Sequence, residues 1–193
     1  MSRWLLIASA LLVLLSLWLP PWLVVEPIAL PGLLQTAANT LLTAVRTLAP
    51  APVPQIVQWL QQVSAPSAWN LLSFSFLSAW VRVAIILPLA AAGIELLLAA
   101  ISLVGQSNGF QQAAGWIGLI GGGLAALLLV FNIPTIQRLG LGVDSIGGIL
   151  ASLLGVRLAW GFWATLATLL LLIAAGFVAL NDARPARRPA RRY

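Results

Sequence analysis

The sequence predicts an all-α membrane protein with four transmembrane helices and with amphipathic interfacial helices in the two outer loops. Three observations predict this fold class: hydrophobic residues make up 61% of the 193 residues, charged residues make up only 7%, and the mean hydropathy is +1.03. About 25% of the residues of a soluble domain are usually charged. We therefore expect lipid, not water, to surround most of this chain.

The spans are predicted from length, because a helix needs roughly 20 mostly apolar residues to cross a hydrocarbon layer about 30 Å thick. In lipid every backbone amide must be paired within its own segment, so a long apolar run is expected to be helical. Four runs qualify: residues 4–25, 78–104, 113–131 and 158–180. They make a single four-helix domain over residues 1–182, and a basic Pro/Arg tail follows at residues 183–193.

The first run also resembles a secretory signal peptide, because Arg3 precedes a long apolar stretch near the N-terminus. This stretch continues well beyond the usual length of a signal-peptide core, and no convincing small-x-small cleavage site comes before Pro20 and Pro21. We therefore expect an uncleaved membrane anchor.

Arginine placement predicts the orientation, because basic residues near span ends are retained on the cytoplasmic side. Half of the ten basic residues lie in the tail: Arg184, Arg187, Arg188, Arg191 and Arg192. With an even number of spans Arg3 joins them inside, while Arg46, Arg138 and Arg157 remain outside as a weaker opposing bias. We expect both termini in the cytoplasm. Arginine without lysine suggests a GC-rich bacterial genome, so the expected location is a bacterial cytoplasmic (inner) membrane.

Tryptophan positions give an independent indication of the span ends, because the amphipathic indole ring prefers the headgroup level of the membrane. Seven of the nine tryptophans fall at or near predicted boundaries: Trp4 and Trp116 at inner ends, and Trp18, Trp22, Trp80, Trp160 and Trp163 at outer ends. Trp59 and Trp69 lie in the long outer loop. Their presence suggests that this loop lies on the membrane.

Each outer loop contains a segment whose apolar residues recur at helical spacing. Residues 32–63 hold two such stripes separated by prolines, and Asp144 is well placed to cap a further amphipathic segment at residues 144–156. Such helices can lie in the interface plane or dock on a partner, and we favour interfacial packing. A re-entrant or closely packed segment is a further alternative in this second loop, because it contains Gly140, Gly142, Gly147 and Gly148.

Two ionisable residues lie within the second predicted span. Burying an acid at a helix centre costs about 2.5 to 3.5 kcal/mol on insertion scales, so Glu95 is a functional candidate by default. We expect a protonated carboxyl that holds helices together by hydrogen bonds, with a proton or cation relay and pairing with a partner subunit as alternatives. The hydroxyl side chains at similar depth are Ser9, Ser102, Thr165 and Thr168. Arg82, near the outer end, is expected to reach the interface or a lipid headgroup.

Glycines give the third predicted span a smooth face for helix packing. They are Gly115, Gly118, Gly121, Gly122 and Gly123. Gly118 and Gly122 match the G-x-x-x-G spacing that lets helix backbones approach closely. The same string contains G-x-x-G-x-x-G, but it is not a nucleotide-binding loop, because no strand precedes it and it lies inside an apolar span.

The chain has no cysteine and no histidine, so it lacks disulfides, thiolate chemistry and the commonest general base and metal ligand. Its four acids, Glu26, Glu95, Asp144 and Asp182, are scattered and form no catalytic motif. We therefore predict a protein that is not an enzyme and that holds no cofactor or metal. The tail arginines are expected to contact anionic lipid headgroups, at about 1 kcal/mol each, or an acidic partner, and we expect no nucleic-acid binding.

The layout of one long outer loop, a short inner loop, a shorter outer loop and a basic inner tail is similar to that of the claudin family. The outer loop of that family carries a Trp-containing motif that ends in two cysteines, and this chain has none. Neither its fold nor its function is carried over.

The function favoured by this composition is that of a non-catalytic structural or accessory subunit that packs within a larger membrane protein complex. A respiratory or photosynthetic electron-transfer complex is the candidate, and other membrane subunits and lipids are the expected partners. Without histidine the chain lacks the usual axial ligand of haem, so contact with a quinone or pigment would occur without ligation. The alternative is a small oligomeric transporter or channel that uses Glu95, although transport usually needs polar or broken helices near the midplane.

Overall fold

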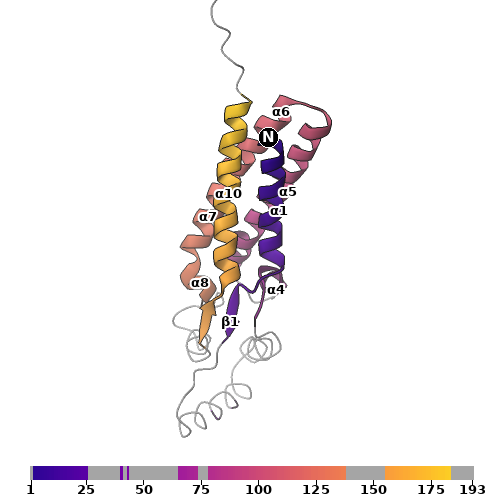
Figure 1. The fold of residues 1–193 in the computed structure, drawn as a ribbon. Helices are drawn as coiled ribbons and strands as arrows, with labels where there is room; N and C mark the ends of the chain where they lie inside the picture. Colours follow the sequence, from indigo (N-terminus) through magenta and orange to yellow (C-terminus); the bar gives the residue numbers. More distant parts are fainter. Residues whose placement is uncertain are drawn as a thin grey trace, which may run out of the picture. The chain divides into compact units, whose positions relative to one another are not determined.

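The computed structural model describes residues 2–25, 40, 43, 65–73, 78–137 and 155–183. The elements in chain order (Figure 1) are α1 (Ser2–Trp18), β1 (Leu23–Val25), α4 (Ala68–Leu72), α5 (Ala79–Val104), α6 (Asn108–Trp116), the π-helix η1 (Ile117–Gly121), α7 (Gly122–Phe131), α8 (Ile133–Gln137), β2 (Val156–Leu158) and α10 (Trp160–Asp182). The predicted amphipathic segments at 32–63 and 144–156 lie outside the described residues, except for Thr40, Thr43 and residues 155–156. The five tail arginines also lie outside them.

Within the described residues, three helices are long and apolar enough to cross a membrane: α5, the continuous helix that comprises α6, η1 and α7 (Asn108–Phe131), and α10. Large apolar side chains cover their outer surfaces, including Leu97, Phe131 and Leu170, which are 65%, 76% and 63% exposed. A soluble monomer rarely exposes so much contiguous apolar surface, so the structure agrees with a membrane protein. The remaining apolar helix, α1, has 17 residues and is shorter than the other three.

The first predicted span is wrong at its outer end. α1 ends at Trp18, because Pro20 and Pro21 lack the N–H group that a helix interior needs and their rings clash with the preceding turn. The chain beyond them was expected to be helical to residue 25, but it is extended: β1 pairs antiparallel with β2, with Leu23 opposite Leu158. The fold is therefore not purely α.

The other predicted spans differ from the structure by a few residues. α5 and α10 begin at Ala79 and Trp160, one and two residues after the predicted starts, while the helix of the third span begins at Asn108, five residues before its predicted start. This early start is polar: residues 108–112 include three amides, so hydropathy alone assigns them to the preceding loop. α5 runs through Pro88.

The described chain forms two compact units. Unit 1 comprises described residues 2–15, 87–127 and 167–183, and thus parts of α1, α5, the α6–η1–α7 helix and α10. Alanines from α5, α6 and α10 build its core together with one leucine from α1: Leu6, Ala99, Ala114, Ala175 and Ala179. Such small residues let apolar helices approach closely in lipid.

Both described ends of the chain lie at the same end of unit 1, beside the start of α6. The Gln111 amide donates to the Ser2 hydroxyl oxygen at 3.0 Å, and the Gln112 amide donates to the Ala183 carbonyl at 3.2 Å. An even number of membrane crossings requires an arrangement of this kind.

Unit 2 comprises the described residues of 16–86 and 128–166. Trp22 lies at its centre and is 0% exposed, although it was expected at the membrane interface. Its indole N–H donates to the Thr165 hydroxyl at 3.1 Å, and its ring packs edge-on against Phe162. Because this hydrogen bond satisfies the polar end of the indole, the whole ring can be buried. In the same unit, Trp18 stacks on Trp69 with 5.2 Å between ring centroids.

Candidate functional site

Glu95 lies on the buried face of α5 in unit 1. Buried residues recur along this face every three or four positions: Ala91, Ala92, Glu95, Ala99 and Ser102. The opposite face carries the exposed Ile94 and Leu97. This spacing turns one side of the helix toward its neighbours, so Glu95 is 0% exposed and does not face lipid.

The carboxyl group of Glu95 is directed at Gly118 in η1. A methyl group added to Gly118 would collide with Oε2 of Glu95, and it would lie 3.1 Å from the carbonyl oxygen of Leu172 in α10. Oε2 of Glu95 in α5 and the carbonyl oxygen of Leu172 in α10 therefore both lie next to the position that a side chain of residue 118 would occupy. This position is free only because residue 118 is a glycine. We call Glu95, Gly118 and the Leu172 carbonyl the Glu95 site.

A π-helical turn coincides with this site. η1 spans Ile117–Gly121 and contains Gly118. Its last residue, Gly121, lies against Ala91, one turn before Glu95: a methyl group on Gly121 would be 3.0 Å from the Ala91 side chain. π-Turns are rare, interrupt α-helices as single bulges and are frequent at functional sites. The sequence carries no signal for this turn apart from its glycines.

Among the residues that the structure describes, neither carboxyl oxygen of Glu95 has a hydrogen-bond partner. Three of the hydroxyls predicted to donate to Glu95 form hydrogen bonds with backbone carbonyls instead. Ser9 and Ser102 in unit 1, and Thr165 in unit 2, donate to carbonyl oxygens at 2.8, 2.8 and 2.9 Å. Ser9, Ser102 and Thr165 are therefore not the partners that the sequence analysis expected for this carboxyl. The depth of burial within unit 1 also argues against pairing with a residue of a partner subunit.

Four of the five glycines predicted to pack helices lie at helix contacts. Besides Gly118 and Gly121, Gly122 lies against Ile173 and Leu172 of α10, where a methyl group would come within 3.2 and 3.3 Å. Gly115 faces Gly176 of α10: a methyl group on Gly115 would be 2.9 Å from the Gly176 carbonyl oxygen. The sequence prediction missed Gly176, the partner across this contact. Gly123 has open space where a side chain would be.

Arg82, the other intramembrane ionisable residue of the prediction, is half-buried in the first turn of α5 in unit 2. Its backbone N–H donates to the Ser78 carbonyl at 3.1 Å. Glu95 and Arg82 thus belong to different units, and thirteen residues, or about 20 Å of helix, separate them along α5.

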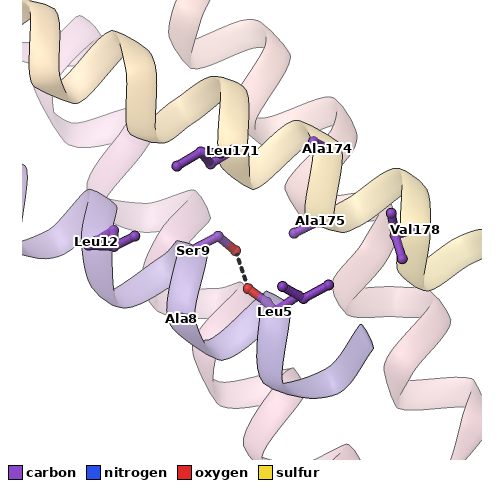
Figure 2. A pocket seen from close by; sticks show the side chains of 8 residues that line it. All are labelled: Leu5, Ala8, Ser9, Leu12, Leu171, Ala174, Ala175 and Val178. Atoms are coloured by element: carbon purple, nitrogen blue, oxygen red, sulfur yellow. Dashed lines mark hydrogen bonds between the residues drawn. The ribbon is translucent and has the colours of Figure 1, made fainter. Parts of the chain in front are cut away.

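An apolar groove lies between α1 and α10 in unit 1 (Figure 2). It has a volume of about 230 Å³ and is lined by Leu5, Ala8, Ser9, Leu12, Leu171, Ala174, Ala175 and Val178. The small residues Ala8, Ser9, Ala174 and Ala175 leave this space open between larger neighbours. The hydroxyl of Ser9 donates to the Leu5 carbonyl within its own helix, so the groove offers almost only carbon atoms to an occupant.

A second groove, of about 330 Å³, lies between α6–η1 and α10 and mixes aromatic with amide side chains. Its lining residues are Gln112, Trp116, Leu119, Phe177, Leu180 and Asn181. A polar cluster joins the same end of unit 1: the Arg3 guanidinium donates to the side-chain oxygens of Gln111 at 2.9 Å and of Asn108 at 3.2 Å. The sequence prediction used Arg3 as an orientation signal and as a signal-peptide feature, and it assigned no role to Gln111.

Comparison of the chain with models of protein families, with curated proteins and with solved structures finds no match.

Proposed function

We propose that this chain is a non-catalytic accessory subunit that packs against other membrane proteins in a larger complex of the bacterial cytoplasmic membrane. The apolar groove between α1 and α10 is the observation that carries this proposal (Figure 2). Lipid tails are as apolar as leucine, so helices in a bilayer associate by close packing at small residues. A groove lined by alanine and serine offers such packing to a partner helix.

Two features of the groove suit a transmembrane helix of a partner. Ala8 and Ala174 are exposed on either side of it, so a large side chain of another helix can enter without displacing a bulky residue. Leu5, Leu12 and Val178 line the same groove and would contact that side chain. The only polar side chain in the lining, Ser9, already has a hydrogen-bond acceptor in Leu5, so an apolar occupant leaves no polar group unpaired.

The proposal includes four crossings with both termini in the cytoplasm and tail arginines against anionic lipid or an acidic partner surface. A respiratory or photosynthetic electron-transfer complex remains the candidate, in which this chain would seal a lipid or quinone space by packing alone. Support comes from the common position of residues 2 and 183 at one end of unit 1, and from the apolar surface of the long helices.

The experiment is extraction of the tagged chain in a mild detergent, followed by native electrophoresis and mass spectrometry. A stoichiometric set of other membrane proteins is expected. Ala8→Leu and Ala174→Leu, which fill the groove, should release these partners, whereas the matched Ala100→Leu, an exposed alanine of α5 outside the groove, should not. Recovery of lipid alone, or equal recovery of partners with all three variants, would refute the proposed groove contact.

The second candidate is a small transporter or channel. The observation in its favour is the carboxyl of Glu95, which is buried and has no hydrogen-bond partner among the described residues. Intramembrane acids often mark ion or proton pathways. Purified wild-type chain and Glu95→Gln would be reconstituted in liposomes, and flux of protons and of monovalent cations would be measured. Flux that requires Glu95 in the absence of other proteins favours the transporter, and no flux above empty liposomes rejects it.

A further inference from the structure

We propose that the Glu95 site is a proton-binding site, in which the Glu95 carboxyl takes up and releases one proton and donates it in a hydrogen bond to the Leu172 carbonyl oxygen. This inference does not depend on the accessory-subunit role, because the groove and the Glu95 site are lined by different residues.

The Glu95 carboxyl is buried in the interior of unit 1. Glu95 is 0% exposed, and among the described residues neither of its oxygens has a hydrogen-bond partner. An ionised carboxylate in such surroundings costs far more free energy than the neutral acid. A bound proton removes the charge, and a partner is then needed only for the new O–H group.

The helices of unit 1 that surround Glu95 carry few charged groups. The α6–η1–α7 helix has no ionisable residue, and the described parts of α1 and α10 in unit 1 carry only Arg3 and Asp182. Leu6 of α1 packs in one cluster with Ala99, one turn from Glu95, so Arg3 lies about two turns, or roughly 10 Å, from the level of Glu95. Asp182 lies ten residues, or about 15 Å, along α10 from Leu172. Neither is placed to neutralise the carboxylate.

The carbonyl oxygen of Leu172 is the acceptor for the proton. The Leu172 carbonyl oxygen and Glu95 Oε2 flank the space left by the missing side chain of Gly118. A carboxylic acid donates one hydrogen bond, and a backbone carbonyl has two lone pairs, so it can accept this bond in addition to its helical one. The missing side chain of Gly118 therefore leaves room beside η1 for both the carboxyl of Glu95 and the carbonyl oxygen of Leu172.

The number of oxygens favours a proton over a metal ion. Hard cations such as Ca²⁺ and Mg²⁺ take about six or more oxygen ligands. Outside the backbone of its own helix, the three atoms nearest to the open point at Gly118 are Oε2 and the carboxyl carbon of Glu95 and the carbonyl oxygen of Leu172. Among the described residues no group of three or more histidine, cysteine, aspartate or glutamate side chains could hold a metal ion.

The test uses dicyclohexylcarbodiimide, an apolar reagent that enters bilayers and reacts with protonated carboxyl groups. The acid proton moves to a carbodiimide nitrogen, the carboxylate oxygen bonds to the central carbon, and an O-to-N acyl shift gives a stable N-acylurea with no leaving group. The full chain in membrane vesicles would be treated between pH 5 and 9 with and without 100 mM NaCl, and peptides that contain residue 95 would be quantified by mass spectrometry.

We expect labelling of Glu95 whose rate falls about tenfold per pH unit once the site begins to lose its proton. Sodium should leave the rate unchanged. Gly118→Ala, which fills the open point, should change the rate at least severalfold, whereas Gly123→Ala, which has open space around it, should match the wild type. Labelling independent of pH, protection by sodium, or no labelling at any pH would each overturn the proposal.

Infrared spectroscopy of the same vesicles provides a second measurement that does not rely on the reagent. The carbonyl stretch of a protonated carboxylic acid should be present in the wild type at low pH, should decline as pH rises, and should be missing from Glu95→Gln at every pH. A wild-type spectrum identical to that of Glu95→Gln would overturn the proposal even if both proteins assemble with the same partners.

Discussion

Replacing Gly176 by alanine should weaken the contact between α10 and the helix formed by α6 and η1. The added methyl group would lie 2.6 Å from the Gly115 carbonyl oxygen and 2.9 Å from the Leu119 backbone nitrogen. Both are backbone atoms, so no side chain can rotate out of the way. Ordinary contact begins near 3.4 Å, so the two helices must separate locally by about 0.8 Å.

The expected loss follows from two opposing effects. Overpacking a well-packed interior costs about 1–3 kcal/mol, and the rigidity of the backbone places Gly176→Ala toward the upper part of this range. Alanine is about 1 kcal/mol better than glycine in a helix interior, which offsets part of the cost. We therefore expect a net destabilisation of about 1–2 kcal/mol, a three- to thirtyfold change in the unfolding equilibrium.

Gly123→Ala is the matched control, because it makes the same chemical change in an apolar helix of unit 1 but meets nothing within 4 Å. It should be neutral or stabilise the protein by up to about 1 kcal/mol through helix propensity. Both variants would be unfolded reversibly by SDS in mixed micelles, with tryptophan fluorescence and far-UV circular dichroism as probes. If Gly176→Ala is as stable as Gly123→Ala, the close contact of Gly115 with Gly176 does not exist as described.

Two further variants test other contacts by the same unfolding assay. Trp22→Phe keeps a ring against Phe162 but removes the indole N–H that donates to Thr165. It should cost about 0.5–1.5 kcal/mol of stability, the net contribution of one hydrogen bond. An unchanged stability would contradict that bond. Gln111→Leu removes the side-chain oxygen that accepts from Arg3 and the amide that donates to Ser2. It should cost about 1–3 kcal/mol of stability, because it leaves buried polar groups unpaired. A variant more stable than the wild type would contradict these contacts.

The long apolar helices were predictable from the sequence because hydropathy and length report the same physical requirement. α5 and α10 begin within two residues of the predicted starts. The end of α1 was also encoded, since Pro20 and Pro21 cannot continue a helix, but the apolar residues beyond them favoured a longer span. The pairing of β1 with β2 joins segments more than 130 residues apart, and no local pattern indicates such a contact.

The candidate site was predictable in part. The cost of an acid in an apolar span identified Glu95, and glycine spacing identified Gly118. What the sequence could not give was the relation between them, because the register of α5 against η1 depends on tertiary packing. The hydroxyls of Ser9, Ser102 and Thr165 were wrong as partners of Glu95, because each donates to a backbone carbonyl of its own helix.

Trp22 shows the limit of reasoning from residue preference. Tryptophan is enriched at membrane interfaces because one edge of its ring is polar, but Thr165 supplies a partner for that edge inside unit 2. Once the N–H group is paired, burial of the large ring stabilises the fold. Five of the predicted boundary tryptophans are exposed within four residues of a helix end and remain consistent with the interface prediction: Trp4, Trp18, Trp80, Trp160 and Trp163. Trp116 is also exposed, but it lies eight residues after the start of the Asn108–Phe131 helix.

The most direct test of the proposed membrane architecture uses single cysteines, because the chain has none of its own. One cysteine would be inserted ahead of Ser2 or would replace Ser73, Gly109 or Asp182, and intact cells would be treated with a membrane-impermeant maleimide before and after lysis. Four crossings with cytoplasmic termini predict labelling of Ser73→Cys in intact cells, and labelling of the other three only after lysis. If the cysteine ahead of Ser2 and Asp182→Cys react from opposite sides of the membrane, the four-crossing arrangement is contradicted.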